Sequence, residues 1–163
     1  MKLYVTGDIN EYYVQTLCMI FFPGEKFTAE EQEGDPVMHI GTSEDEQGVL
    51  ATARLCYRGK EASAEKRISW NEEESADRTR KIAIGYAVLG AAGEVMHYRP
   101  SWGMLTGVRP SKVAMEYLRK GHTKAQTRKL LSTNYMVLPK KASLAIDVAR
   151  REQKLIGDRK SVV

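Results

Sequence analysis

The order of apolar and polar positions predicts that the chain begins with a strand followed by a helix. Residues 2–7 form a short apolar run typical of a strand, and residues 9–20 repeat apolar side chains at helical spacing. The Pro-Gly pair at 23–24 ends that helical pattern. Asp8 and Glu11 have the D-x-x-E spacing of a capping box, so we expect the helix to begin just after Asp8.

The pattern from residue 36 to residue 70 alternates, which is typical of strands with one buried face. Residues 36–41 form the first such run, and the acidic stretch 42–48 predicts a turn. Residues 49–70 then predict a β-hairpin that turns at Arg58-Gly59-Lys60. The positions expected on its buried face are Val49, Ala51, Ala53, Leu55, Tyr57, Ala62, Ala64, Ile68 and Trp70.

Helical spacing prevails after the hairpin. Asn71 and Glu74 have capping-box spacing and predict a helix that ends at Gly93. Further helices are predicted over 110–120, with Pro110 in the first turn, over 123–131, capped by Thr123 and Gln126, and from Pro139 onward. We therefore expect an α+β fold. A small antiparallel sheet with two packed helices occupies residues 1–98, and an all-helical arm occupies residues 99–163.

The composition is that of a soluble globular protein, with 42% hydrophobic and 28% charged residues among 163. Apolar runs are too short for a membrane span, and the first residues lack the apolar segment of a secretory signal, so we expect a cytoplasmic location. Cys18 and Cys56 have neither disulfide-framework nor metal-site spacing, and the three histidines are scattered. We therefore expect no metal site.

Charge is distributed unevenly along the chain. Residues 1–50 contain 2 Lys and Arg against 10 Asp and Glu, whereas residues 100–163 contain 14 against 4. The two ends could form solvated faces of opposite sign, or the basic arm could bind nucleic acid or an acidic ligand. The basic positions that could follow phosphates are Lys112, Arg119, Lys120, Lys124, Arg128 and Lys129. No series of aromatic residues interleaves with these cations, which counts against nucleic-acid binding.

The segment SWGMLTGVRP, residues 101–110, is unusual for a connection because it combines apolar side chains, two glycines and an arginine. Gly103 and Gly107 permit positive φ or close backbone approach, and the proline after Arg109 favours an extended Arg109. With Lys112 in the helix that follows, this segment could form an anion site. Alternatively it is a hinge, with Arg109 bonded to loop carbonyls and Trp102, Met104 and Leu105 anchoring the arm to the sheet domain. The chemistry of the residues alone favours the hinge.

Motifs of common enzyme classes are missing from the sequence. It contains no G-x-G-x-x-G, no phosphate-binding P-loop, no H-E-x-x-H and no G-x-S-x-G. No Cys/His or Ser/His spacing indicates an activated nucleophile. From its own residues we therefore expect no catalytic site in this chain.

The segment WGMLTGVRPSKVAMEYLRKGHTKAQTRKLL and the later LPKKASLAIDVARREQKLI resemble the region before the radical SAM domain in oxygen-independent coproporphyrinogen III oxidase-like proteins. The coproporphyrinogen dehydrogenase type is the most similar. Its block WG-x-LTG-[IV]-RP-[TS]-K precedes two helices and then a cluster-binding C-x-x-x-C-x-x-C. The matching positions are Trp102, Gly103, Leu105, Thr106, Gly107, Val108, Arg109, Pro110, Ser111 and Lys112.

The resemblance implies that a full-length protein of this type binds a 4Fe-4S cluster and S-adenosylmethionine. Such a protein would oxidatively decarboxylate two propionates of coproporphyrinogen III, although some relatives carry haem instead. Cys18 and Cys56 cannot supply the three closely spaced cysteines of the C-x-x-x-C-x-x-C motif. We therefore expect this chain to be a non-catalytic N-terminal accessory domain, truncated before the cluster motif, whose partner is the radical SAM domain of the same protein.

The resemblance also directs the anion-site hypothesis toward a tetrapyrrole. The expected substrate-binding side chains are Arg109, Lys112, Trp102 and Thr106, on a loop whose backbone freedom comes from Gly103 and Gly107. Two other functions stay open from the sequence. One is a nucleic-acid-binding module that uses the basic arm, and the other is a purely structural docking domain.

Overall fold

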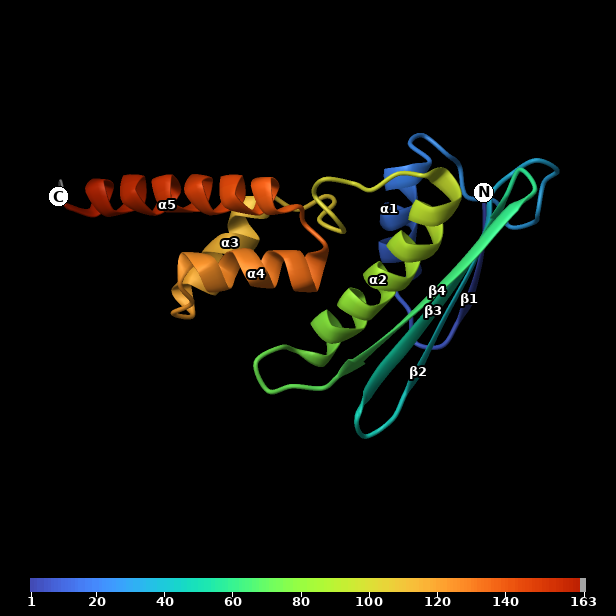
Figure 1. Ribbon diagram of the computed structural model, residues 1–163, viewed down its shortest axis with the longest axis horizontal. Helices are drawn as coiled ribbons and strands as arrows, with labels where there is room; N and C mark the ends of the chain where they lie inside the picture. Colours follow the sequence, from blue (N-terminus) through green and yellow to red (C-terminus); the bar gives the residue numbers. More distant parts are fainter. Residues whose placement is uncertain (162–163) are drawn as a thin grey trace. The chain divides into compact units, whose positions relative to one another are not determined.

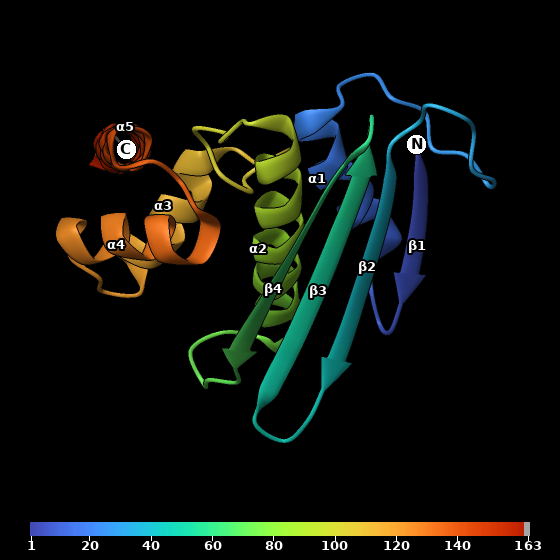
Figure 2. The same ribbon diagram turned by 45° about the vertical axis from the view of Figure 1, so that its right-hand side comes forward.

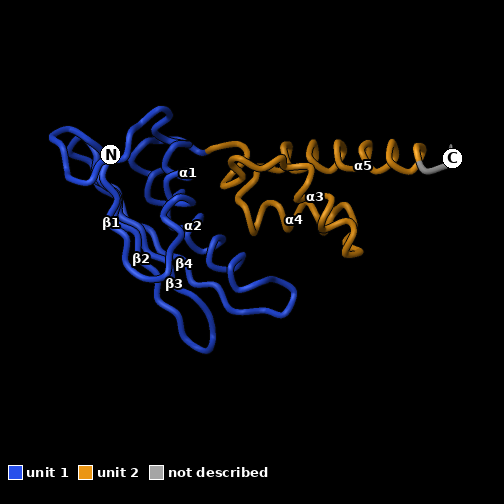
Figure 3. The backbone as a smooth tube through the Cα atoms, turned by 180° about the vertical axis from the view of Figure 1, so that it is seen from behind, with its two compact units in different colours: residues 1–99 blue, residues 100–163 orange. Residues whose placement is uncertain are grey.

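The computed structural model describes residues 1–161 and divides the chain into two compact units (Figure 3). The first unit comprises Met1–Arg99, and the second begins at Pro100. In chain order the first unit contains β1 (Lys2–Thr6), α1 (Glu11–Phe21), β2 (Val37–Glu44), β3 (Gly48–Tyr57), β4 (Lys60–Ser69) and α2 (Ala76–Met96).

The sheet of the first unit has the strand order β1-β2-β3-β4, and α1 and α2 cover one of its faces (Figures 1 and 2). Strands β2, β3 and β4 are antiparallel neighbours, whereas β1 pairs with β2 in parallel. The parallel pair exists because α1 carries the chain back across the sheet between β1 and β2. The predicted α+β class is confirmed, and the sheet is mixed rather than antiparallel throughout.

The core of the first unit lies between the sheet and its two helices. Alternate residues of β3, from Val49 to Leu55, are buried as the period of two predicted. They pack with the other side chains of the same layer, which include Leu3, Val14, Leu17, Met38, Ile40, Ile84, Val88 and Leu89. The exposed positions on the opposite sheet face are mostly polar. Figure 2 shows no helix of this unit on that face.

Two predicted boundaries before the hairpin were wrong. The N-cap of α1 is Asn10, whose side-chain oxygen accepts from the Tyr13 N–H at 3.2 Å, so the proposed Asp8–Glu11 capping box does not form. Strand β2 continues to Glu44, within the expected acidic turn, because it pairs with β3 as far as Val49. Ladder pairing with a neighbour outweighed the low strand propensity of this polar segment.

Both predicted ends of α2 were also misplaced. Asn71 does accept a hydrogen bond from the Glu74 N–H, but this bond closes a turn, and Ser75 is the N-cap of the helix. The helix continues past Gly93 to Met96, and His97 closes it in the left-handed conformation with φ 50°. The Tyr98 N–H donates to the Gly93 carbonyl at 3.2 Å. Gly93 is therefore a residue of the last helical turn, and its carbonyl accepts one of the bonds that close the helix.

The N-terminal amino group is held inside the first unit. It donates to Glu25 Oε1 at 3.0 Å, to Asp35 Oδ2 at 3.1 Å and to the Lys26 carbonyl at 2.8 Å, and the Met1 side chain is fully buried. Burial alone would lower the pKa of this amino group. The hydrogen bonds that the amino group donates to the two carboxylates, with their negative charges, outweigh burial, so its pKa is raised above its ordinary value of 8.0.

In its described part, residues 100–161, the second unit contains the helices α3 (Pro110–Arg119), α4 (Lys124–Tyr135) and α5 (Pro139–Ser161) (Figure 1). Pro110 takes the first helical position, and Thr123 and Gln126 form the predicted reciprocal capping box. Helix α4 extends beyond the predicted end at residue 131 because Leu131 and Tyr135 are both buried in the core of this unit. Within residues 1–161, no helix is both long and apolar enough to cross a membrane.

Candidate functional site

The segment 101–109 lies against the connection between α4 and α5. The Met104 N–H donates to the Tyr135 carbonyl at 2.9 Å, and the Leu138 N–H donates to the Ser101 carbonyl at 3.0 Å. The segment is therefore joined to that connection by backbone hydrogen bonds running in both directions. These bonds lie inside the second unit and stabilise the start of α3 relative to α5.

The two glycines of the segment have different functions. Both adopt positive φ, 58° at Gly103 and 67° at Gly107. A Cβ at Gly103 would lie 1.9 Å from the Tyr135 carbonyl oxygen and 2.5 Å from the Met136 carbonyl carbon. A Cβ at Gly107 would meet nothing within 4 Å. Gly103 is therefore required for close backbone approach, whereas Gly107 is favoured for its backbone conformation alone.

The apolar side chains of the segment pack within the second unit to different degrees. Met104 is 3% exposed, whereas Trp102 and Leu105 are half-buried. The Lys141 ammonium of α5 lies 5.5 Å from the centre of the Trp102 ring, which is within cation–π range. Met104 is the packed anchor of the segment, and the expected contact of these three side chains with the sheet unit stays a prediction.

Arg109 is extended, with φ −69° and ψ 116°, as its position before a proline predicts. Its Nη1 lies 3.3 Å from Oε1 of Glu152 in α5, and the arginine side chain is 69% exposed. Lys112 is exposed and Thr106 is half-buried. Arg109 contacts Glu152, and Trp102 contacts Lys141. At the rise per residue of an α-helix, Lys141 and Glu152 are about 16 Å apart along α5. These two predicted side chains therefore engage separate turns of one helix.

Ser111 was matched as part of the motif, but no feature of the sequence indicated its burial. It is 4% exposed, and its Oγ makes no hydrogen bond to any residue in the described part of the chain. Arg109, two residues earlier, is the N-cap of α3 and provides no side-chain hydrogen bond to that helix. The partners Glu152 and Lys141 were also missed, because no sequence spacing relates them to the loop.

The two thiols of the chain lie in the first unit and do not fit an iron–sulfur cluster. Cys18 is buried in α1, and burial raises its pKa to about 12. The pKa of Cys56 in β3 is raised by burial and by the nearby Glu61 carboxylate, whose Oε2 lies 3.5 Å from the sulfur. Both thiols therefore favour the protonated form, which is not a cluster ligand. Within residues 1–161, no three His, Cys, Asp or Glu side chains are grouped as metal ligands.

Comparison with known proteins finds a distant relative of the expected kind. The chain is 25% identical over 129 residues to the oxygen-independent coproporphyrinogen-III oxidase-like protein HemZ of Bacillus subtilis (strain 168). The match covers 78% of this chain and 26% of that protein, so the chain spans about a quarter of its relative's length. No protein-family model matches, and no solved structure matches. The resemblance carried by residues 101–112 is thus supported independently, and the chain is a distant relative of an oxygen-independent coproporphyrinogen-III oxidase-like protein.

Proposed function

We propose that this chain is the N-terminal accessory domain of a longer coproporphyrinogen dehydrogenase-type radical SAM enzyme and is not catalytic by itself. The observation that carries the proposal is the coverage of the match, most of this chain against about a quarter of a coproporphyrinogen-III oxidase-like protein. The cluster, S-adenosylmethionine and the chemistry on the propionates would then belong to the radical SAM domain of the same cytoplasmic protein.

The segment 101–112 is the part of this chain that we propose contacts the tetrapyrrole. Coproporphyrinogen carries four propionates on an apolar macrocycle, so its binding surface must combine cations with apolar groups. Arg109 and Lys112 are exposed cations, and Trp102 offers a half-buried ring. The contacts of Trp102 and Arg109 on separate turns of α5 suit a large ligand better than a compact one.

The ion pair between Arg109 and Glu152 does not prevent such a role. The arginine of this pair is largely exposed and the glutamate partly so, and a solvent-accessible pair of this kind contributes only about 0.2–1 kcal/mol. A propionate can therefore replace the Glu152 carboxylate at small cost. A bidentate bond between a guanidinium and a propionate is stronger than the single 3.3 Å contact seen here. Thr106, half-buried beside Gly107, would add a hydroxyl donor.

A purely structural docking domain is the second candidate, and a specific observation favours it. The backbone bonds of residues 101 and 104 and the close approach at Gly103 explain much of the motif without any substrate. They do not explain the side chains of Arg109, Lys112 or Thr106, which are not required for those bonds. The distant relationship does not favour the nucleic-acid alternative.

The test compares Arg109→Ala with Arg119→Ala in the longer protein that carries this chain. Arg119 is an exposed arginine at the other end of α3 and controls for loss of positive charge. Binding of coproporphyrin III, a stable oxidised analogue, is followed by its fluorescence. Loss of a charged hydrogen bond at Arg109 should weaken binding roughly 10- to 150-fold with little change in melting temperature. The control should bind normally.

Two results would contradict the proposal. If Arg109→Ala lowers the melting temperature and leaves the affinity intact, the segment is structural. If removal of residues 1–163 from the longer protein abolishes cluster assembly, the domain is more than an accessory. The first of these results does not depend on any side chain of the sheet in the first unit.

A further inference from the structure

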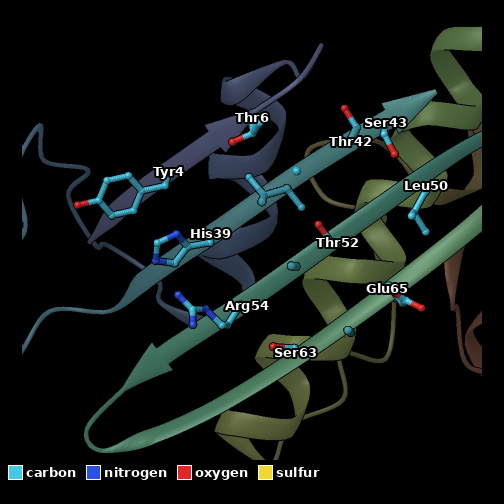
Figure 4. A pocket seen from close by; sticks show the side chains of 14 residues that line it. Tyr4, Thr6, His39, Thr42, Ser43, Leu50, Thr52, Arg54, Ser63 and Glu65 are labelled. Carbon is cyan, nitrogen blue, oxygen red and sulfur yellow. The ribbon is translucent and has the colours of Figure 1, made fainter.

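The sheet face opposite α1 and α2 contains a hollow of about 680 Å³ (Figure 4). Its lining comes from all four strands and includes Tyr4, His39, Gly41, Thr52, Arg54 and Ser63. We propose that this hollow is a binding site for a small polar organic anion, a phosphate ester or a carboxylate. The volume is typical of small-molecule sites. The inference uses the first unit alone and is independent of the proposed accessory-domain function.

The hollow exists because β2 has no side chain at its middle. Gly41 lies between Thr6 of β1 and Thr52 of β3 in the register of the sheet, and both neighbours are short. The φ of Gly41 is not positive, so its backbone does not need glycine. A Cβ there would lie 3.3 Å from Thr52 Oγ1 and would begin to fill the floor. The glycine therefore creates space rather than a turn.

One end of the hollow has three side chains that suit an oxyanion. Tyr4, His39 and Arg54 are register partners across β1, β2 and β3, and the Tyr4 and His39 rings stack with centres 4.7 Å apart. In Figure 4 the His39 ring and the Arg54 guanidinium lie next to each other over the strands. A guanidinium binds carboxylate and phosphate with two parallel N–H bonds, and an imidazole N–H adds a third donor.

Arg54 is available for such a ligand. It is 48% exposed, and its Nη1 makes a contact of 3.5 Å with Glu61 Oε1, which is long for a hydrogen bond. The stacked Tyr4 ring limits the positions open to His39, and the Tyr4 hydroxyl donates to Glu31 at 2.8 Å. The oxyanion end is thus partly ordered before any ligand binds, and its strongest donor, Arg54, is held only by one long contact with Glu61.

The remaining wall is lined by hydroxyl groups without partners. The hydroxyls of Thr6, Ser43, Thr52 and Ser63 make no hydrogen bond to any other group in residues 1–161. Glu65, on the far wall, likewise has no partner among those residues and points away from Arg54 in Figure 4. Its negative charge disfavours an anion at that end. The ligand's oxyanion should therefore lie at His39 and Arg54, with a polar body extending toward Thr52.

The site is tested by titrating the ¹⁵N-labelled chain, residues 1–163, and following its backbone amide signals. The probes are ribose 5-phosphate, gluconate, neutral ribose and inorganic phosphate at millimolar concentrations. Ribose 5-phosphate or gluconate should give saturable shifts at Gly41, Thr52 and Arg54, with affinity about 10-fold above that of ribose. Binding of ribose 5-phosphate but not gluconate identifies a phosphate-ester site, and binding of gluconate but not ribose 5-phosphate identifies a carboxylate site; either result supports the proposal.

Three variants separate this site from general attraction of anions. Arg54→Gln should weaken binding about 10-fold, because one bidentate charged bond is lost. Arg67→Gln is the matched control, since Arg67 is an exposed arginine of β4 that pairs with Asp45 and does not line the hollow. Its affinity should stay within about twofold of the parent chain. Gly41→Val should abolish binding by filling the floor, provided that its amide spectrum remains dispersed.

Several results would overturn the proposal. Absence of saturable shifts with both organic anions excludes the site. Equal weakening by Arg54→Gln and Arg67→Gln shows nonspecific attraction. If ribose binds as tightly as the organic anion that gives saturable shifts, the oxyanion contact does not exist. If inorganic phosphate binds as tightly as ribose 5-phosphate, the polar body makes no contact. If Gly41→Val fails to fold, the surface variant Arg54→Gln still decides the question.

Discussion

Substitution of the two loop glycines by alanine tests why the segment 101–109 has its sequence. At both positions alanine must adopt positive φ, which costs roughly 1–2 kcal/mol. At Gly103 the new Cβ would also lie 1.9 Å from the Tyr135 carbonyl oxygen. The clash involves backbone atoms of the α4–α5 connection, so no side-chain rotation relieves it, and overpacking of this kind costs about 1–3 kcal/mol.

The displacement at Gly103→Ala should also break the hydrogen bond from the Met104 N–H to that carbonyl, worth about 1 kcal/mol. We therefore expect Gly103→Ala to lower the free energy of unfolding by ~3–6 kcal/mol and Gly107→Ala by ~1–2 kcal/mol. The difference between the two variants isolates the close approach, because the conformational cost is common to both.

The assay is urea unfolding of the chain in a Trp70→Phe background, so that Trp102 fluorescence reports on the second unit. Circular dichroism at 222 nm confirms that each variant is helical before urea is added, because a helix-rich unit gives its main signal there. If the free energies of unfolding of the two variants differ by less than about 0.5 kcal/mol, the close approach at Gly103 contributes nothing to stability. It then does not explain why the motif has glycine there.

Three further outcomes follow from burial and charge. Met104→Ala should lower the free energy of unfolding by ~2–5 kcal/mol in the same urea assay. Trp102→Ala, followed by circular dichroism because this change removes the fluorescent reporter, should lose less than the ~3–5 kcal/mol of a fully buried aromatic, since its ring is half-buried; a loss in that range would contradict this expectation. The charged Met1 amino group should stabilise the fold fully below its ordinary pKa of 8.0 and lose that contribution as pH rises through its raised folded pKa. Unfolding free energies measured between neutral and alkaline pH should show this loss, and a chain acetylated at Met1 should not. Cys18 should resist a thiol reagent in the native chain and react on unfolding, because it is buried with its pKa raised to about 12; rapid native labelling, located by mass spectrometry, would contradict its burial.

Local features of the sequence determined much of the backbone of this protein. The proline at 110 predicted both the extended Arg109 and the first turn of α3, since ring and backbone sterics act between neighbours. Thr123 and Gln126 predicted the start of α4 because a capping box closes within four residues. The alternation in β3 predicted its buried face, and Arg58 and Gly59, both at positive φ, form the predicted hairpin turn.

Local patterns failed where a competing local signal or a distant partner decided the outcome. Asp8 had the right spacing for a cap, but Asn10 lies where the helix begins, and either residue type can cap a helix with its side-chain oxygen. The parallel pairing of β1 with β2 depends on how α1 crosses the sheet. In the same way, β2 continues to Glu44 because β3 pairs with it.

Tertiary structure alone decided the surroundings of the candidate sites. The motif indicated that residues 103 and 107 need glycine, and only packing against Tyr135 distinguishes the two. Only the fold brings Glu152 to Arg109, and only sheet register brings His39 beside Arg54 around the space left at Gly41. Backbone preferences arise from sterics and hydrogen bonds between near neighbours, so the sequence reveals them directly. Contacts between distant residues form only when the chain packs. Local preferences do not specify these contacts, because the same preferences are compatible with many different pairs of partners.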